Sequence, residues 1–352
     1  MNKRIVAILF CYFGTTLGCD WLENVNVSGV DTNDNKFTQV LSGCISDASF
    51  NFSVKILYIR NQEHIETLGE GSVRNMSTVR TVSFWGCPIE TITPGLFLDV
   101  PNLVNVQIAY GNLQEIPRGA FSNLPAMEML RIHNNKIDII EDLSFANLRF
   151  LKRIHVDFNQ LEYWNREWFT NSTNVEILDF QVNKIRTLPR RAFEKLPKLR
   201  QIYFDDNDIS VIHADAFKGI RKLEYLGLRY NQLKEINENI FPNNLKIRTL
   251  LLDRNNLNFL ANEVLKKISA EDVTLDNNPW KCPCLDRIKY WVFVNNGTIR
   301  ETQSCIGGRI PVCAYSTGFS QTCLEYVDNE LTERYRKALL SVVPPIDKTC
   351  LQ

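Results

Sequence analysis

The sequence predicts an α/β solenoid, a stack of short coils that share one core, and three observations support this fold class. Similar stretches recur every 23 to 25 residues, an Asn stands at the same place in most of them, and a Phe follows ten residues later. A regular helix does not repeat with this internal pattern. Stacked repeats do, because each unit buries its apolar face only against its neighbours.

Ten units lie within residues 54–278, and the stretch LEYLGLRYNQLKEI (223–236) shows their internal pattern. Apolar residues stand at offsets 0, 3, 5, 10 and 13, and offsets 3 and 5 are apolar in all ten units. Such alternation predicts a short strand with one buried face. The units start at Val54, Val79, Leu103, Met127, Leu151, Val175, Leu199, Leu223, Ile247 and Ala270.

Offset 8 marks the turn that ends each strand, and an Asn occupies it in seven units. This column contains Asn135, Asn159, Asn183, Asn207, Asn231, Asn255 and Asn278. A buried, unpaired polar group costs about 1–3 kcal/mol, and an Asn amide both donates and accepts hydrogen bonds. We therefore expect an Asn ladder, with Cys87 in one slot as a buried free thiol and a looser stack at Gln62 and Gly111.

Offset 18 carries an aromatic column that we assign to the core rather than to a cofactor site. It contains Phe97, Phe121, Phe145, Phe169, Phe193, Phe217 and Phe241, followed by Leu265. With the Asn ladder, this column resembles the leucine-rich repeat family in the 24-residue form common outside cells. The resemblance implies a right-handed horseshoe with a parallel sheet on the concave face and irregular or 3₁₀ turns on the convex face.

The N-terminus predicts secretion. A basic MNKR precedes a charge-free apolar run that ends in small residues, so residues 1–18 read as a signal peptide. The run is shorter than the roughly 20 residues that a membrane anchor requires, and no later run reaches that length. We expect a secreted, extracellular glycoprotein in an oxidising compartment. Its five predicted glycosylation sites are Asn26, Asn51, Asn75, Asn171 and Asn296.

A solenoid exposes its core at both ends and needs caps. We assign residues 19–53 to the N-terminal cap, 279–325 to a cysteine-rich C-terminal cap and 326–352 to a short helical tail. The segment LDRIKYWVFV (285–294) reads as a helix of the C-terminal cap. A second amphipathic helix over residues 324–340 is expected to pack on that cap.

The cap sequence NPWKCPC resembles the C-terminal cap of secreted leucine-rich repeat proteins. That resemblance implies disulfides Cys282–Cys305 and Cys284–Cys323. The alternative interpretation of the Cys-x-Cys pair is a zinc site, which secretion and the lack of a nearby His disfavour.

The remaining cysteines leave alternatives open. Cys19 and Cys44 are expected to close the N-terminal cap. Cys350 either pairs with Cys313, which we favour, or links to another chain and so forms a disulfide-linked oligomer through the tail.

Offsets 2, 4 and 6 point away from the core and tile the concave face. A basic patch, defined by Arg131, His133, Arg153 and His155, lies on adjacent strands. Acidic and aromatic residues follow it, and opposite charges with aromatic anchors suit protein recognition. The predicted ligand-binding residues are the basic patch together with Asp157, Asp179, Tyr203, Asp205, Tyr225 and Arg229.

Several function classes are disfavoured. The formal net charge of 0 gives no reason to expect nucleic acid or an anionic membrane as partner. Asp157 and Asp179 resemble a glycosidase pair, but on an open sheet, so we expect no enzyme. His133 and His155 lack a third convergent ligand in the sequence, so no metal site or cofactor is predicted.

The chain also resembles the secreted leucine-rich immune proteins of insects. That resemblance implies a recognition protein of innate immunity that binds an extracellular protein or a microbial surface ligand through its concave face. The alternatives are an extracellular matrix or cell-surface adhesion module and a purely structural scaffold.

Overall fold

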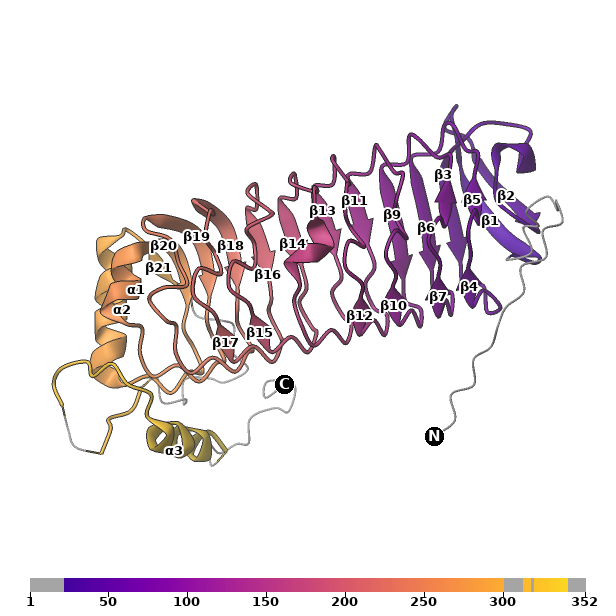
Figure 1. Cartoon of the computed structure of the whole chain (residues 1–352). Coiled ribbons are helices and arrows are strands. Elements are labelled where there is room, and N and C mark those ends of the chain that lie inside the picture. Colours follow the sequence, from indigo (N-terminus) through magenta and orange to yellow (C-terminus); the bar gives the residue numbers. More distant parts are fainter. Residues whose placement is uncertain (1–21, 301–312, 318–319, 341–352) are drawn as a thin grey trace, which may run out of the picture.

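The computed structural model describes residues 22–300, 313–317 and 320–340, and its centre is one sheet of 13 strands (Figure 1). In order along the sheet these are β2 (Lys36–Leu41), β1 (Val25–Asp31), β3 (Val54–Arg60), β6 (Thr81–Trp85), β9 (Asn105–Ala109), β11 (Met129–Arg131), β13 (Arg153–His155), β14 (Ile177–Asp179), β16 (Gln201–Tyr203), β18 (Lys222–Gly227), β19 (Leu245–Leu251), β20 (Ile268–Thr274) and β21 (Thr298–Ile299). From β3 onward, neighbouring strands are parallel. The predicted solenoid is confirmed.

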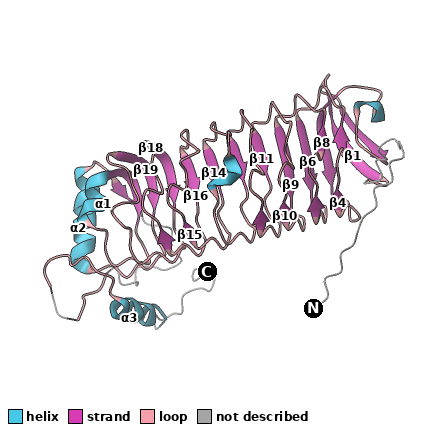
Figure 2. Ribbon diagram, in the orientation of Figure 1, coloured by secondary structure: helices cyan, strands magenta, loops and turns pink. Residues whose placement is uncertain are grey.

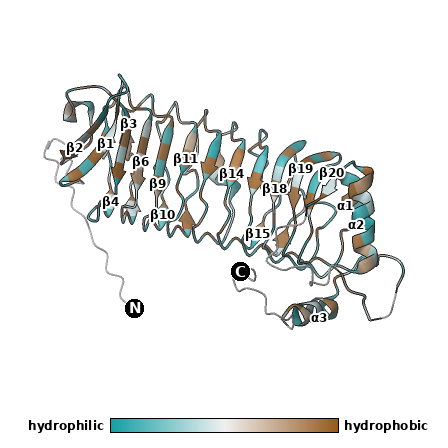
Figure 3. Cartoon of the chain, turned by 180° about the vertical axis from the view of Figure 1, so that it is seen from behind, coloured by the Kyte–Doolittle hydropathy of each residue, from teal (hydrophilic) through white to brown (hydrophobic). Residues whose placement is uncertain are grey.

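The strands stack in register at the spacing of the sequence repeat. Leu130 of β11 faces Ile154 of β13, which in turn faces Leu178 of β14, and all three side chains are fully buried. Side chains on either side of them point to the opposite face, so apolar and polar residues alternate along the strands (Figure 3). Offsets 3 and 5 therefore supply the core, and offsets 2, 4 and 6 supply the concave face.

The Asn ladder forms as expected, as Asn159 shows. Its Nδ2 donates to the carbonyl of Ile132 in the preceding unit at 2.9 Å, and its Oδ1 accepts from the N–H of Ile137 at 3.1 Å. Cys87 occupies its slot as a buried free thiol, with Sγ 3.8 Å from the Ile59 carbonyl oxygen. Each slot thus pairs turn groups that would otherwise be buried without partners.

The expectation of a looser stack at Gln62 and Gly111 is wrong. Gln62 Oε1 accepts from the N–H of Asn26 at 2.9 Å, which joins the ladder to the first strand of the chain. At Gly111 a Cβ would lie 2.7 Å from the carbonyl oxygen of Cys87, so the turns pack closely there because this residue has no side chain.

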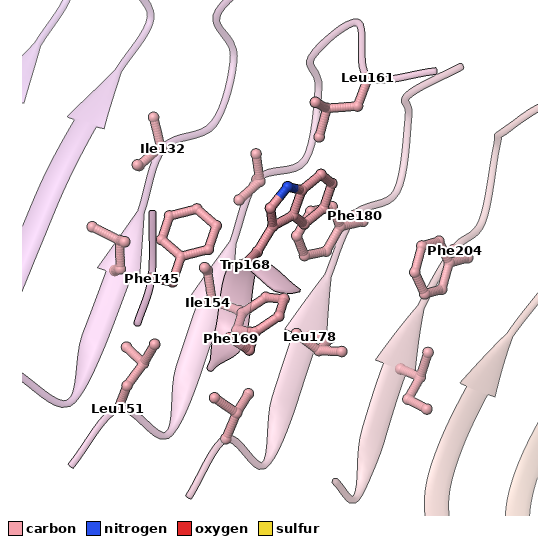
Figure 4. Packing of buried hydrophobic residues seen from close by; sticks show 14 of the residues in the cluster. Ile132, Phe145, Leu151, Ile154, Leu161, Trp168, Phe169, Leu178, Phe180 and Phe204 are labelled. Carbon is pink, nitrogen blue, oxygen red and sulfur yellow. The ribbon is translucent and has the colours of Figure 1, made fainter. Parts of the chain in front are cut away.

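The Phe column forms a buried aromatic spine, and one repeat modifies it. Phe193 and Phe217 lie 5.2 Å apart between ring centroids, and Phe145 and Phe169 lie 5.5 Å apart. Between Phe169 and Phe193, Trp164 contacts both rings at 5.6 and 5.4 Å. Figure 4 shows Phe169 in the core beside Trp168, a neighbour from the same repeat.

The return path of each coil contains only short elements (Figure 2). Its two-residue strands are β4 (Thr67–Leu68), β5 (Val73–Arg74), β7 (Thr91–Ile92), β8 (Phe97–Leu98), β10 (Glu115–Ile116), β12 (Ile139–Ile140), β15 (Thr187–Leu188) and β17 (Val211–Ile212). Its helical turns are η2 (Arg166–Phe169) and α1 (Asn262–Lys267), while η1 (Asp47–Ser49) precedes the first unit. This matches the irregular convex side that the sequence predicts.

The N-terminal end of the core is covered by a β-hairpin. β1 pairs antiparallel with both β2 and β3, so the hairpin closes the parallel sheet on that side. Cys44 is disulfide-bonded. Its predicted partner Cys19 and the predicted signal peptide lie outside the described residues.

The C-terminal end is covered by α2 (Cys282–Val294), which matches the predicted cap helix. Cys284 is bonded to Cys323, as the family resemblance implies. The predicted Cys282–Cys305 bond is wrong, because Cys282 is bonded to Cys313. This bond also overturns the favoured Cys313–Cys350 pair; Cys305 and Cys350 lie outside the described residues.

The predicted tail helix is shorter than expected. α3 (Asn329–Leu340) begins five residues later, and Leu324 lies before it with its side chain exposed. Leu331 and Tyr335 are buried, and Thr332 accepts at Oγ1 from Asn258 Nδ2 at 3.1 Å. α3 therefore docks on the last repeats. Within the described ranges, no helix is long and apolar enough to cross a bilayer.

Candidate functional site

The register of the sheet determines which side chains meet on the concave face. Arg131 pairs with His155, His155 with Asp179, and Asp179 with Tyr203, so these residues form one row across four strands. Residues two positions apart on one strand share this face. The row therefore brings the basic patch and the first acidic residues together, as the repeat pattern predicts.

In the part of the chain that the structure describes, the two arginines of the basic patch form no ion pair. Among the described residues, no carboxylate lies within ion-pair distance of Arg131 or Arg153. Burial, and then the charge of Arg153, lower the pKa of Arg131. The patch thus holds two repelling cations, one of them partly withdrawn from water, which a bound anion would stabilise.

His133 is held by neutral groups. Its Nε2 lies 3.2 Å from Gln107 Nε2 and its Nδ1 lies 2.9 Å from Asn134 Nδ2. Its ring also meets Trp85 and Tyr110 edge-on, at centroid distances of 5.9 and 5.5 Å. Burial, with smaller contributions from His155 and Arg131, lowers the pKa of His133, which favours the neutral form of this ring.

Trp85, Tyr110 and Gln107 were not among the residues predicted to bind a ligand. The Trp85 and Tyr110 rings lie 4.3 Å apart, beside His133. Gln107 and Trp85 stand at offsets 4 and 6 of their units, which the repeat assigns to the concave face, whereas Tyr110 stands at offset 7, outside that pattern.

His155, Asp157 and Asp179 form a tight cluster between the basic and acidic residues. His155 Nδ1 lies 3.2 Å from Asp179 Oδ2. One potential ligand atom from each of the three side chains lies within 4.8 Å of the others. Burial, and then the charge of Asp179, raise the pKa of Asp157 to about 6. The two carboxylates therefore repel each other beside a single imidazole.

Further along the sheet, Asp205 is buried among partners of its own. Its Oδ2 accepts from the Tyr225 hydroxyl at 3.1 Å, and its Oδ1 accepts from the backbone N–H of Arg229 at 3.2 Å. The Arg229 Nε lies 3.8 Å away. Burial raises the pKa of Asp205 to about 6, although Arg229 and Tyr225 oppose this effect.

Gly227 provides the space for this carboxylate. It lies on the concave face between Tyr203 and Leu251, where the other units have a side chain. A Cβ here would lie 2.3 Å from Asp205 Oδ2. The absence of a side chain is therefore what lets Asp205 fold back onto the sheet.

The two predicted aromatic anchors pack against each other. Tyr203 and Tyr225 stack at 4.2 Å between ring centroids. The Tyr203 hydroxyl donates to Gln201 Oε1 at 3.0 Å, while that of Tyr225 donates to Asp205. Of the ten predicted ligand-binding residues, these two, Asp205 and Arg229 form one self-paired group.

The five predicted glycosylation sites are all exposed. The list comprises Asn26, Asn51, Asn75, Asn171 and Asn296. Four of these residues lie outside the strands of the main sheet. The fifth, Asn26, lies on β1, near the N-terminal end of that sheet. None of the five belongs to the row from Arg131 to Tyr203.

Comparison with sequence families identifies the repeats. A family described as "Leucine rich repeat" matches residues 101–161, 149–209 and 202–257, and one described as "BspA type Leucine rich repeat region (6 copies)" matches residues 36–124. Together the two families cover most of the chain. No curated protein matches the sequence.

Solved structures share the fold at low sequence identity. A chain of the Drosophila Toll–Spatzle complex matches with a TM-score of 0.60 and 20% identity, over 70% of this chain and 38% of the other. A chain of the mouse RP105/MD-1 complex matches with a TM-score of 0.52 and 15% identity, over 76% of this chain and 58% of the other. This chain thus spans well under half of the Drosophila chain that it resembles.

Proposed function

Because this chain belongs to the leucine-rich repeat proteins, we propose that it is a secreted, non-enzymatic recognition protein that binds a protein ligand through its concave face. The ligand is an extracellular protein or a microbial surface component, and the setting is innate immunity. The ligand surface carries acidic groups opposite the basic patch.

The observation that carries this proposal is the pair Arg131 and Arg153. They lie on adjacent strands, and no carboxylate among the described residues neutralises them. Holding two guanidinium groups together on a rigid sheet is unfavourable until an anion joins them. Arginine is also the residue best suited to bidentate contacts with carboxylates.

The neighbouring residues would set the orientation of that ligand. Asp157 and Asp179 follow the basic patch within two strands, so the face changes sign over a short distance. Complementary charge guides the two proteins toward each other and disfavours incorrect relative placements of the two surfaces. Trp85 and Tyr110 beside His133 offer aromatic surface of the kind that anchors protein interfaces.

An extracellular setting is supported by the disulfides Cys282–Cys313 and Cys284–Cys323, since such bonds persist in oxidising compartments. The exposed sequons agree with this setting. The fold shared with a chain of the Toll–Spatzle complex, described as a molecular hub in Drosophila development and innate immunity, supports the immune role by analogy.

A capture experiment tests the proposal. Wild-type protein and an Arg131→Glu/Arg153→Glu variant are used to capture partners from native extracellular fluid with and without microbial challenge. The wild type is expected to retain a specific protein that the variant loses, because charge reversal repels an acidic ligand. Circular dichroism should show the same fold for both.

The matched control is Arg118→Glu/Arg149→Glu, which makes the same change in net charge at exposed positions outside the concave face. This control should capture the partner normally. Equal capture by the patch variant eliminates the basic patch as the site. A partner found on host cells in the absence of any microbial product favours the adhesion module over the immune role.

A further inference from the structure

The cluster of His155, Asp157 and Asp179 has the composition of a metal site. β13 and β14 pair in register, which places His155 and Asp179 on neighbouring strands, and Asp157 follows His155 by two residues on the same face. His155 and Asp179 thus lie on the rigid sheet, and Asp157 lies in the segment that directly follows β13. One ligand atom from each lies within 4.8 Å of the others.

The spacing of these atoms fits a small tetrahedral ion. Zn–N and Zn–O distances near 2 Å place two ligands of a tetrahedral site about 3.3 Å apart. His155 Nδ1 and Asp179 Oδ2 are 3.2 Å apart. We propose that His155, Asp157 and Asp179 bind a divalent transition-metal ion, Zn²⁺ being the best match, with a fourth position open to water or to a carboxylate of a partner.

The ligand types favour zinc over the alkaline-earth ions. One imidazole nitrogen and two carboxylate oxygens suit Zn²⁺, whereas Ca²⁺ takes six to eight oxygen ligands and Mg²⁺ usually retains several waters. The ion would also neutralise the repulsion between Asp157 and Asp179. To bring all three ligand atoms to the tetrahedral spacing, the Asp157 carboxylate must move toward the other two ligands by at most about 1.5 Å. Rotation of its side chain allows this shift.

Surrounding groups orient the ligands. The backbone N–H of Gln181 donates to Asp179 Oδ1 at 3.3 Å, which turns Oδ2 toward His155. Such outer contacts are typical of ligands in metal sites. His133 is not a ligand, because both of its ring nitrogens face the amides of Gln107 and Asn134. The site therefore differs from a His133–His155 pair.

Direct titration of the untagged, chelator-treated full chain tests this inference and needs no knowledge of the protein ligand. Calorimetry with Zn²⁺ should give one strong site per chain. Co²⁺ should give the visible absorption bands of a tetrahedral complex. His155→Ala, Asp157→Asn and Asp179→Asn should each weaken Zn²⁺ binding by at least about 100-fold, since outer contacts alone contribute 10- to 100-fold.

Two variants serve as controls, and circular dichroism checks that all variants fold. His133→Gln removes the neighbouring imidazole, and Asp138→Asn removes an exposed carboxylate outside the cluster. Both should bind Zn²⁺ as the wild type does. The inference is overturned if the wild type binds no Zn²⁺, if the three ligand variants bind it normally, or if His133→Gln weakens binding as much as His155→Ala. Because the metal assay and the capture experiment are independent, either proposal can fail alone.

Discussion

Two neighbouring regions of the concave face use their polar groups differently. In the central region, on β11, β13 and β14, Arg131 and Arg153 have no carboxylate partner among the described residues, and Asp157 lies against Asp179. In the region on and just beyond β16 and β18, Asp205 is buried with a hydroxyl, a backbone N–H and a guanidinium around it. The repeat pattern is the same in both regions.

This difference indicates which region stabilises the fold and which region is available to bind a ligand. A buried polar group must have its partners in the folded chain, and removing one of them is costly. We therefore expect the region around Asp205 to act mainly in stabilising the fold. The central region leaves like charges side by side, so its favourable interactions are available to something that binds.

The largest expected effect is that of Gly227→Ala on stability. The new Cβ would lie 2.3 Å from Asp205 Oδ2, so the carboxylate must leave Tyr225 and Arg229 while still buried. We expect a loss of about 3 kcal/mol in the free energy of unfolding, measured by urea denaturation. In an Asp205→Ala background the same change should cost less than about 1 kcal/mol. Equal costs in both backgrounds would contradict this account of Gly227.

A smaller effect is expected for the pH dependence of stability. Burial raises the pKa of Asp205 from its ordinary value of 3.8 to about 6, so the folded state holds the proton of this group more tightly than the unfolded state does. Its contribution to the free energy of unfolding is therefore greatest below about pH 4, falls as the pH rises through about 6 and is lost by about pH 7.

The difference between the wild type and Asp205→Asn isolates this contribution, on the order of 2 kcal/mol across that window. Relative to the wild type, the variant should gain stability as the pH rises from 4 to 7. The measurement is urea denaturation at several pH values. A difference that does not change with pH would show that Asp205 titrates normally.

The smallest expected effect lies in the central region. Arg153→Ala removes an exposed cation that repels Arg131 and forms no ion pair with any residue that the structure describes. The free energy of unfolding should change by no more than about 0.5 kcal/mol, while partner capture falls. A loss of stability comparable to that of Gly227→Ala would remove the distinction between the two regions.

Much of the site followed from the repeat alone. Once the period is known, the offsets place Arg131, His155 and Asp179 in one row, because parallel strands in register align equivalent residues. The contacts within the row did not follow. The sequence gives no sign that Asp205 folds over Gly227, since that depends on the direction of a side chain. It gives no sign either that one polar atom each of His155, Asp157 and Asp179 lies within 4.8 Å of the others.

The cysteines show the same limit. Cys284–Cys323 was expected, but Cys282 has more than one other downstream candidate, and in the structure it is bonded to Cys313. Spacing does not decide between them, because the chain between cap cysteines has no repeat to set its path. The start of α3 was misplaced for a related reason: an amphipathic pattern locates a helix better than it locates its ends.

The sequence by itself determined the solenoid, its period, the Asn ladder, the Phe spine and the composition of the concave face. These features repeat because every unit must bury one apolar face and form hydrogen bonds to the polar groups of one turn. Only the tertiary structure decided which polar side chains satisfy one another and which remain available. Those partners come from different coils, and their pairing depends on distances of a few ångströms that no single repeat encodes.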